Sequence, residues 1–276
     1  MIKRKKSIFK RMQENEKVQK ISSILLPISF GVLIVVLWQT QVLHAWLHTD
    51  TFTLPLPTRI ISIVLDNIPK ILKNAVATVT VSVFGLTAGS LIGYGIAVLG
   101  TFFPKWGAGG LSIVGAFNAI PIVALAPVMT NWTKDVSKDA NIRSMVAKIL
   151  VVMIVCIASM SINAYRGLTE LKPFSMDLMD SYAASRGMKF FKLQLPNSIP
   201  YVFTALRVSV PASVISAIVS EYFAEYVIGV GRQIRENIVL AQYSTAWAYI
   251  SVACLIGIVM YGILMLFESI LLKYRR

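Results

Sequence analysis

The sequence predicts an all-α integral membrane protein with six transmembrane helices. Of its 276 residues, 56% are hydrophobic and only 14% are charged, whereas soluble domains carry about 25% charged residues. The chain divides into apolar runs of about 20 residues, the length that crosses a bilayer, and Lys and Arg residues flank these runs. The net charge of +14 therefore indicates the positive-inside distribution of a membrane protein and not a nucleic-acid-binding patch.

The N-terminal part predicts a basic cytoplasmic tail over 1–20, followed by a single transmembrane domain over 21–276 whose first span covers 21–43. His44 and His48 come next, at the i, i+4 spacing of a helical metal pair. Only Asp50 lies nearby as a further ligand, so we interpret both as surface histidines and predict no metal site.

The next region predicts an outer turn and a tightly packed second span. Leu-Pro-Leu-Pro at 54–57 indicates a stiff, extended turn. Apolar residues at helical spacing then predict an amphipathic helix over 58–72, lying on the outer interface. The second span, 74–99, carries Gly85, Gly89 and Gly93 in a tandem G-x-x-x-G pattern. Small residues at this spacing let helices approach closely in lipid, so we predict helix packing there.

The third span, 111–130, contains two prolines, Pro121 and Pro127, which interrupt its hydrogen-bond ladder. Such a break is tolerated where protein or a water-filled cavity satisfies the freed carbonyls. A broken helix at mid-membrane depth points to a solute path, to which we assign Asn118, Pro121 and Pro127. A kink used only for packing is the alternative. A polar outer loop over 131–143 and a fourth span over 144–164 follow.

The loop 166–198 contains the most distinctive stretch, 177–196. It is too charged to lie in lipid, and Arg186, Lys189 and Lys192 place it in the cytoplasm. Its pattern is an acid at 177, small residues at 183–185, a basic-aromatic helix, and Leu195-Pro196.

The fifth span, 199–223, carries serines on one helical face, namely Ser209, Ser213, Ser216 and Ser220. This face either packs against a neighbouring helix or lines an aqueous path. Glu221 follows, and an acid at a membrane helix end is a functional candidate. The alternative is an ion pair with Arg232 or Arg235. An outer loop over 225–244 leads to the sixth span, 245–272, and a cytoplasmic C-terminus.

The stretch 177–196 resembles the EAA loop of type I ABC import permeases, which runs E-A-A-x-x-x-G, nine residues, then I-x-L-P. Asp177 falls on the Glu, Ala183 on the Gly, and Leu195-Pro196 closes the motif. Leu178-Met179 replaces the two alanines. The family glycine permits a positive φ, so Ala183 must use a different turn or bear strain, or the nearby Gly187 takes over that role.

Three further segments resemble this family in the same order along the chain, and the first of them resembles the signature of its nitrate/taurine/sulfonate branch. They are L-P-x-P at 54–57, A-I-P-x-x-A-L-A-P at 119–127, and L-P-Y-x-F-x-G-L-R at 199–207, with Ala205 in place of the glycine. The resemblance implies a MetI-like fold with a cytoplasmic coupling helix between the fourth and fifth helices.

The resemblance also implies function and partners. The chain would be the permease subunit of a bacterial cell-membrane importer for a small polar solute: a sulfonate, nitrate, a thiamine precursor or another small organic solute. A second permease subunit making a homodimer, two ABC ATPase subunits and an extracellular or periplasmic binding protein would complete the assembly. The residues implied to couple to the ATPase are Asp177, Met179, Tyr182, Ala183, Ala184, Ser185, Arg186, Gly187, Phe190, Phe191, Lys192, Leu195 and Pro196.

Several activities are excluded by missing motifs. No G-x-x-x-x-G-K-[ST] occurs, so we expect ATP and Mg²⁺ on the partner ATPase and no cofactor in this chain. No clustered acids, histidines or metal ligands indicate an enzyme. One alternative is the T component of an energy-coupling-factor transporter, which Ser185-Arg186-Gly187 faintly resembles. Another is an ATPase-independent channel or scaffold that oligomerises through the glycine ridge.

Overall fold

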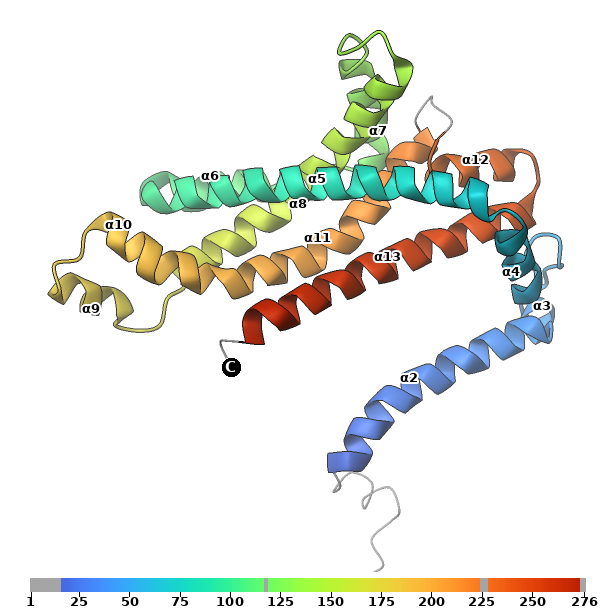
Figure 1. The fold of residues 1–276 in the computed structure, drawn as a ribbon, viewed down its shortest axis with the longest axis horizontal. Helices are drawn as coiled ribbons and strands as arrows, with labels where there is room; N and C mark the ends of the chain where they lie inside the picture. Colours follow the sequence, from blue (N-terminus) through green and yellow to red (C-terminus); the bar gives the residue numbers. More distant parts are fainter. Residues whose placement is uncertain (1–15, 117–118, 224–227, 274–276) are drawn as a thin grey trace, which may run out of the picture.

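The computed structural model describes residues 16–116, 119–223 and 228–273, and within these ranges the chain forms helices and turns but no strand. Figure 1 shows the long helices α5, α8, α11 and α13 forming the body of the molecule, with α2 standing apart from them. The helices in order are α2 (Glu16–Gln39), α3 (Val42–Leu47), α4 (Pro57–Asp66), α5 (Ile68–Phe102), α6 (Pro104–Ala116), α7 (Ile122–Trp132), α8 (Ala140–Thr169), α9 (Ser175–Ser181), α10 (Arg186–Lys189), the π-helix η2 (Phe190–Gln194), α11 (Leu195–Phe223), α12 (Val230–Val239) and α13 (Tyr243–Leu272).

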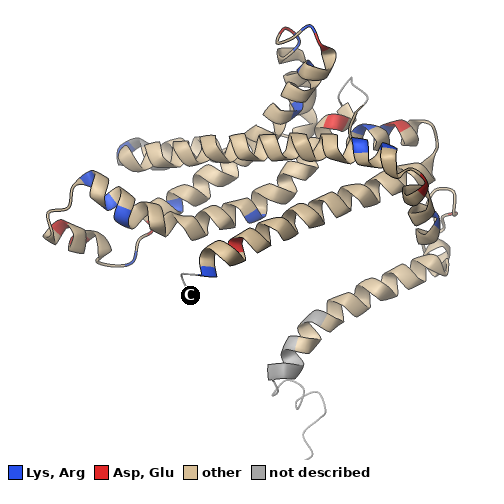
Figure 2. Cartoon of the chain, in the orientation of Figure 1, with Lys and Arg blue, Asp and Glu red and all other residues tan. Residues whose placement is uncertain are grey.

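The predicted class, an all-α membrane protein, is confirmed. Among the described residues, five helices are long and apolar enough to cross a membrane; they lie at 21–39, 68–102, 140–169, 186–223 and 243–272. Figure 2 shows charged residues mostly near helix ends, with long uncharged stretches between them. This distribution is what a bilayer requires, because a charge at mid-membrane depth is unfavourable.

The third predicted span is not one helix, so the six-helix count is not confirmed. Helix α6 ends at Ala116 and α7 begins only at Ile122. Pro121 precedes α7 with extended backbone angles of φ −63° and ψ 121°. Proline lacks an N–H donor and disfavours helical geometry in the residue before it, which explains why α7 begins anew after Pro121. Pro127 lies inside α7, whereas Asn118 lies outside the described residues.

Other element boundaries also differ from the prediction. The first span stops at Gln39, because Gln41 adopts a left-handed φ of 63° before α3 begins. The amphipathic helix predicted over 58–72 is divided at Asn67, which separates α4 from α5. The side-chain amide of Asn67 donates to the Ile63 carbonyl at 3.0 Å. The outer loop predicted over 225–244 contains a helix, α12.

His44 is buried and not on the surface as predicted. It is only 5% exposed, and its Nε2 lies 2.6 Å from the Leu54 carbonyl oxygen. The pair therefore joins α3 to the Leu-Pro-Leu-Pro turn. His48 is exposed, as expected for a surface histidine.

The glycine ridge of α5 lies directly against α8. A Cβ atom built on Gly85 would lie 2.5 Å from the Val152 Cβ, and one on Gly93 would lie 2.7 Å from the Ile157 carbonyl oxygen. On Gly89 the nearest atom is the Met153 carbonyl oxygen, also at 2.5 Å. The backbones of the two helices thus approach as closely as glycine allows.

Replacing Gly89 by alanine is expected to destabilise the close packing of α5 against α8. The added methyl group meets backbone and cannot be relieved by a side-chain rotation, so we expect a loss of about 1–3 kcal/mol from overpacking. Thermal unfolding in detergent measures this loss. Gly95→Ala is the matched control on the same helix, since no atom lies within 4 Å of its built Cβ. Equal melting temperatures for the two variants would contradict the prediction.

Candidate functional site

The distinctive stretch folds into two short helices joined by a tight turn. Helix α9 ends with the amide of Ala183 donating to the Asp180 carbonyl at 2.8 Å and that of Ala184 donating to the Met179 carbonyl at 3.0 Å. These two crossed bonds form a Schellman motif. Ser185 then caps α10 by accepting from the Met188 amide at 3.3 Å.

Ala183 itself takes the left-handed conformation, with φ 51°. Its position at the end of the Schellman motif is usually a glycine, because a Cβ atom disfavours this geometry. Gly187 lies inside α10 and does not replace it. Of the alternatives drawn from the sequence, the structure therefore shows the strained alanine.

Replacing Ala183 by glycine is expected to stabilise the turn. A left-handed alanine costs about 1–2 kcal/mol, and the entropy lost by glycine offsets about 0.5–1 kcal/mol of that gain. Hydrogen exchange of the α9 amides should therefore slow by several-fold. Ala184→Gly is the control, because Ala184 has no positive φ. Faster exchange in Ala183→Gly than in Ala184→Gly would contradict the assignment of strain to residue 183.

The segment presents an exposed apolar surface. Helix α9 has no buried residue. Tyr182 is 77% exposed and Phe191 is 66% exposed. The other large apolar side chains exposed on this segment are Phe174, Leu178 and Met188. Around them lie the exposed charged residues Asp177, Arg186 and Lys192, while Met179 is half-buried.

Phe190 does not belong to this surface, which corrects its assignment from the sequence. It is only 8% exposed and packs in a core cluster with Met160 and Leu168 of α8 and Ala205 of α11. Its ring centroid lies 5.3 Å from that of Phe102, at the end of α5. The adjacent residues Phe190 and Phe191 therefore differ in burial, and the buried Phe190 anchors the segment to the bundle.

Further contacts fix the segment to the helices behind it. Asp180 of α9 forms an ion pair with Lys189 of α10. At the start of α11, the side-chain amide of Asn197 donates to the backbone carbonyls of Gly167 and Glu170 at 2.8 and 3.1 Å. Leu195 packs against the Phe190 cluster. With Pro196, it begins α11 directly after η2, so a displacement of α9 would be transmitted to α8 and α11 together.

The serine face of α11 is buried inside the subunit, as in the packing alternative drawn from the sequence. Ser209, Ser213 and Ser216 are 0% exposed and Ser220 is 3% exposed. Ser213, Ser216 and Ser220 donate to carbonyls of their own helix at 2.7–2.8 Å. The Ser209 carbonyl lies 4.0 Å from Cys156 of α8. Their small size allows α11 to pack closely against its neighbours.

Glu221 is fully buried and holds the start of α12. Three successive amides there donate to side chains of α5 and α11. The pairs are Gly229 with Asn74 Oδ1 at 3.0 Å, Val230 with Thr78 Oγ1 at 3.0 Å, and Gly231 with Glu221 Oε2 at 2.9 Å. The Thr78 hydroxyl also donates to Glu221 Oε2, at 2.9 Å. Orphan donors at a helix start are thereby satisfied by distant parts of the chain.

The sequence did not reveal these partners of Glu221. Arg235, one of the predicted ion-pair partners, instead donates to the Tyr222 carbonyl at 3.1 Å. Asn74 and Thr78 could have indicated a buried polar contact, because they are polar residues one helical turn apart in an apolar run. Lys148 was also missed, although a lysine inside a spanning segment is a functional candidate.

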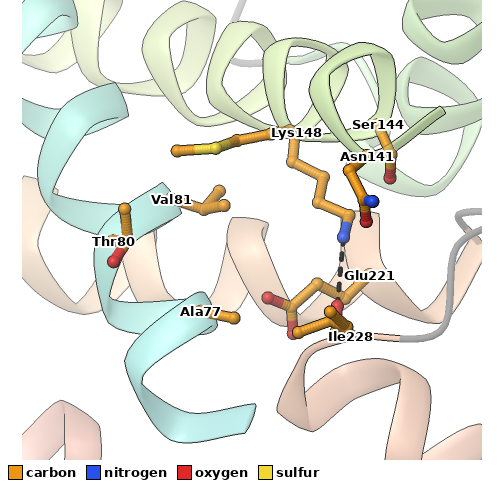
Figure 3. Close-up of a pocket in the computed structure, with 9 residues that line it drawn as sticks. Ala77, Thr80, Val81, Asn141, Ser144, Lys148, Glu221 and Ile228 are labelled. Carbon is orange, nitrogen blue, oxygen red and sulfur yellow. Dashed lines mark hydrogen bonds between the residues drawn. The ribbon is translucent and has the colours of Figure 1, made fainter. Parts of the chain in front are cut away.

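A cavity of about 220 Å³ lies beside Glu221, between α5 and α8. Figure 3 shows Lys148 directed across it toward Glu221 and Ile228. The Lys148 ammonium donates to the Ile228 carbonyl at 3.2 Å. The remaining walls include Ala77, Thr80, Val81 and Met145, with Asn141 and Ser144 on α8.

Comparison with known proteins decides the family. The profile of the binding-protein-dependent transport system inner membrane component family matches residues 85–273, which include the stretch 177–196 and Glu221. The chain belongs to this family. It is the permease of a type I ABC importer, an integral inner-membrane protein and not an enzyme.

Two curated relatives are similar to the permease. A formylaminopyrimidine transport permease protein, ThiX, of Halalkalibacterium halodurans is 24% identical over 251 residues, which are 91% of this chain and 96% of the relative. A probable ABC transporter permease protein of Haemophilus influenzae is 24% identical over 192 residues, covering 70% and 74% of the two chains.

A solved structure supports the fold. The crystal structure of an amino acid ABC transporter with histidines matches with a TM-score of 0.60 at 17% identity, covering 74% of the permease and 95% of that chain. The MetI-like fold implied by the sequence is thereby confirmed. Family membership also implies an ABC ATPase and a solute-binding protein as partners.

Proposed function

We propose that the permease receives the motion of its ATPase partner through the exposed surface of α9, α10 and η2. This surface, which we call the coupling surface, consists of Asp177, Leu178, Tyr182, Arg186, Met188, Phe191 and Lys192. Its apolar side chains fill a groove of the ATPase, and its charges set the register. The observation that carries the proposal is the exposure of large apolar residues on a segment fixed to α8 and α11.

The mechanism is a rigid-body movement. Phe190 and Asn197 join the coupling surface to the bundle. ATP-driven closure of two ATPase subunits pulls together the coupling surfaces of two permease copies in a homodimer. The helices then rock between inward-open and outward-open states. The break around Pro121, together with Pro127, lies along the solute path, since non-helical backbone at membrane depth requires a protein or water-filled surrounding.

The coupling surface and both chain ends face the cytoplasm, and the α7–α8 turn and α12 face outward. The solute is small and polar: a sulfonate, nitrate or a thiamine precursor. The similarity to a formylaminopyrimidine transport permease supports the thiamine-precursor class. ATP and Mg²⁺ bind to the ATPase, and the binding protein delivers the solute.

Purification of the chain from native membranes in mild detergent tests this function. We expect an ABC ATPase and a second copy of the permease in the same complex, together with ATP hydrolysis. A chain that purifies alone in every mild detergent, with no associated hydrolysis, would contradict coupling and favour an ATPase-independent channel.

A further inference from the structure

Two buried polar atoms beside the Glu221 cavity have no hydrogen-bond partner among the described residues. They are Glu221 Oε1 and Ser144 Oγ. Glu221 is 0% exposed and Ser144 is 8% exposed, and both residues line the cavity. Buried polar atoms are normally paired, and Glu221 Oε2 is already bonded to Thr78 and Gly231. The free acceptor and the free hydroxyl are therefore available to a molecule in the cavity.

The two charged residues that line the cavity are opposite in sign. Glu221 supplies a carboxyl group and Lys148 an amino group from the opposite wall (Figure 3), within electrostatic range of each other, and Arg232 of α12, which does not line the cavity, also acts on Lys148. Most of the remaining wall is apolar, including Ala77, Val81 and Met145. An ion of either sign would lose its hydration here, while one of the two charged groups repelled it. A molecule without net charge avoids this penalty.

The cavity can be approached from the α7–α8 turn. Ser144 also lines a second cavity of about 340 Å³, together with Thr130, Lys134 and Arg143. On α8, Asn141, Ser144, Met145 and Lys148 lie at helical spacing along one face of the first cavity. Asn141 is exposed, so this face leads from the surface to Glu221.

We propose that the Glu221 cavity is a binding site for a small solute that has no net charge but carries both a hydrogen-bond donor and an acceptor. The donor pairs with Glu221 Oε1, and the acceptor pairs with Lys148 and Ser144. Zwitterions, including amino-sulfonates, and neutral heterocyclic amines both fit this description, so of the solute classes proposed above nitrate is excluded from this site. The site is smaller than the roughly 300–1,000 Å³ of typical drug-sized pockets. The inference rests on the proposed function, because the bound molecule is taken to be the solute in transit.

Charge-selective labelling tests the site. Ser144→Cys and Thr80→Cys, on opposite walls, are introduced one at a time into the complete complex on a Cys254→Ser background, in which the remaining Cys156 is buried. The probes are cationic 2-aminoethyl and anionic 2-sulfonatoethyl methanethiosulfonate. Each rate is normalised to the same reagent with free mercaptoethanol. We expect both cysteines to react from water, with a cation-to-anion rate ratio near one.

Removing either charge should move this ratio in opposite directions. Lys148→Met leaves Glu221 unopposed and is expected to raise the ratio by about tenfold or more, and Glu221→Gln to lower it by about as much. Met145→Leu is the control, since it lines the cavity without charge. Because Glu221 also caps α12, the Lys148→Met variant alone suffices if Glu221→Gln does not fold.

Two results would overturn the inference. Cysteines that no aqueous reagent labels would show a cavity closed to solutes, and a ratio unmoved by Lys148→Met would show that the charges do not govern entry. ATPase co-purification is measured on the same samples. If the ATPase co-purifies but labelling fails, only the proposed binding site is contradicted. If the ATPase does not co-purify, the proposed function itself is contradicted.

Discussion

Replacing Tyr182 by aspartate is expected to abolish ATP-driven solute uptake while leaving the permease in the membrane at its normal level. Tyr182 is 77% exposed and directly follows α9, a helix that has no buried residue, so the substitution should not disturb the fold. In the complex it places an unpaired charge in an apolar interface, which costs several kcal/mol. Since about 1.4 kcal/mol corresponds to a tenfold change in affinity, we expect ATPase binding to fall at least tenfold.

The measurement combines uptake into proteoliposomes with ATPase retention on the purified permease. Phe191→Asp should behave in the same way, because Phe191 is 66% exposed on the same surface. The matched control is Trp132→Asp at the end of α7, where the side chain is 75% exposed but lies outside the coupling surface. Normal uptake by Tyr182→Asp, or ATPase loss in Trp132→Asp as well, would remove the coupling surface from the mechanism.

Replacing Gly229 by alanine is expected to prevent α12 from docking on the bundle. Gly229 has φ 133° and ψ 154°, a region open essentially only to glycine. A Cβ atom built there would lie 2.3 Å from the Glu221 Cδ, which is itself held by Thr78 and Gly231. Backbone strain of about 1–3 kcal/mol and overpacking of about 1–3 kcal/mol should together produce one of the largest losses for a single methyl group in this chain.

Thermal unfolding in detergent and hydrogen exchange of the α12 amides measure this loss. Gly257→Ala, inside α13, is the control because no atom lies within 4 Å of its built Cβ. Alanine is also more favourable than glycine in a helix interior by about 1 kcal/mol, so Gly257→Ala should be neutral or stabilising. Equal stability and equal α12 protection in the two variants would show that Glu221 and Gly229 are not packed as described.

The fold class could be predicted because a bilayer imposes helix length and polarity directly on the sequence. Apolar runs of spanning length predicted the regions of α5, α8, α11 and α13, and the spacing of Gly85, Gly89 and Gly93 marked a surface that the structure places against α8. Hydrophobicity alone did not show that the backbone at Pro121 is extended and that a separate helix, α7, begins after it. It also obscured α12, whose apolar and polar residues alternate at helical spacing within a polar segment.

The motif located the coupling segment but could not orient its side chains. Phe190 and Phe191 are adjacent and chemically identical, yet the first is buried against Phe102 and the second is exposed. Their directions depend on the π-helix η2 and on α5, which is distant in sequence. The partners of Glu221 show the same limit, since Thr78 lies 143 positions away and only the packed helices bring the two together.

The capped start of α12 also determines how the permease can treat an anionic solute. Helix dipoles place a partial positive charge at their N-terminal ends, which commonly hold phosphate, sulfate or carboxylate groups of ligands. In this permease the chain's own carboxylate, Glu221, occupies that end, and the first three amides of the region are already bonded. The dipole of α12 is therefore neutralised within the protein, and a negative group on a solute in this cavity must be met by the side chain of Lys148.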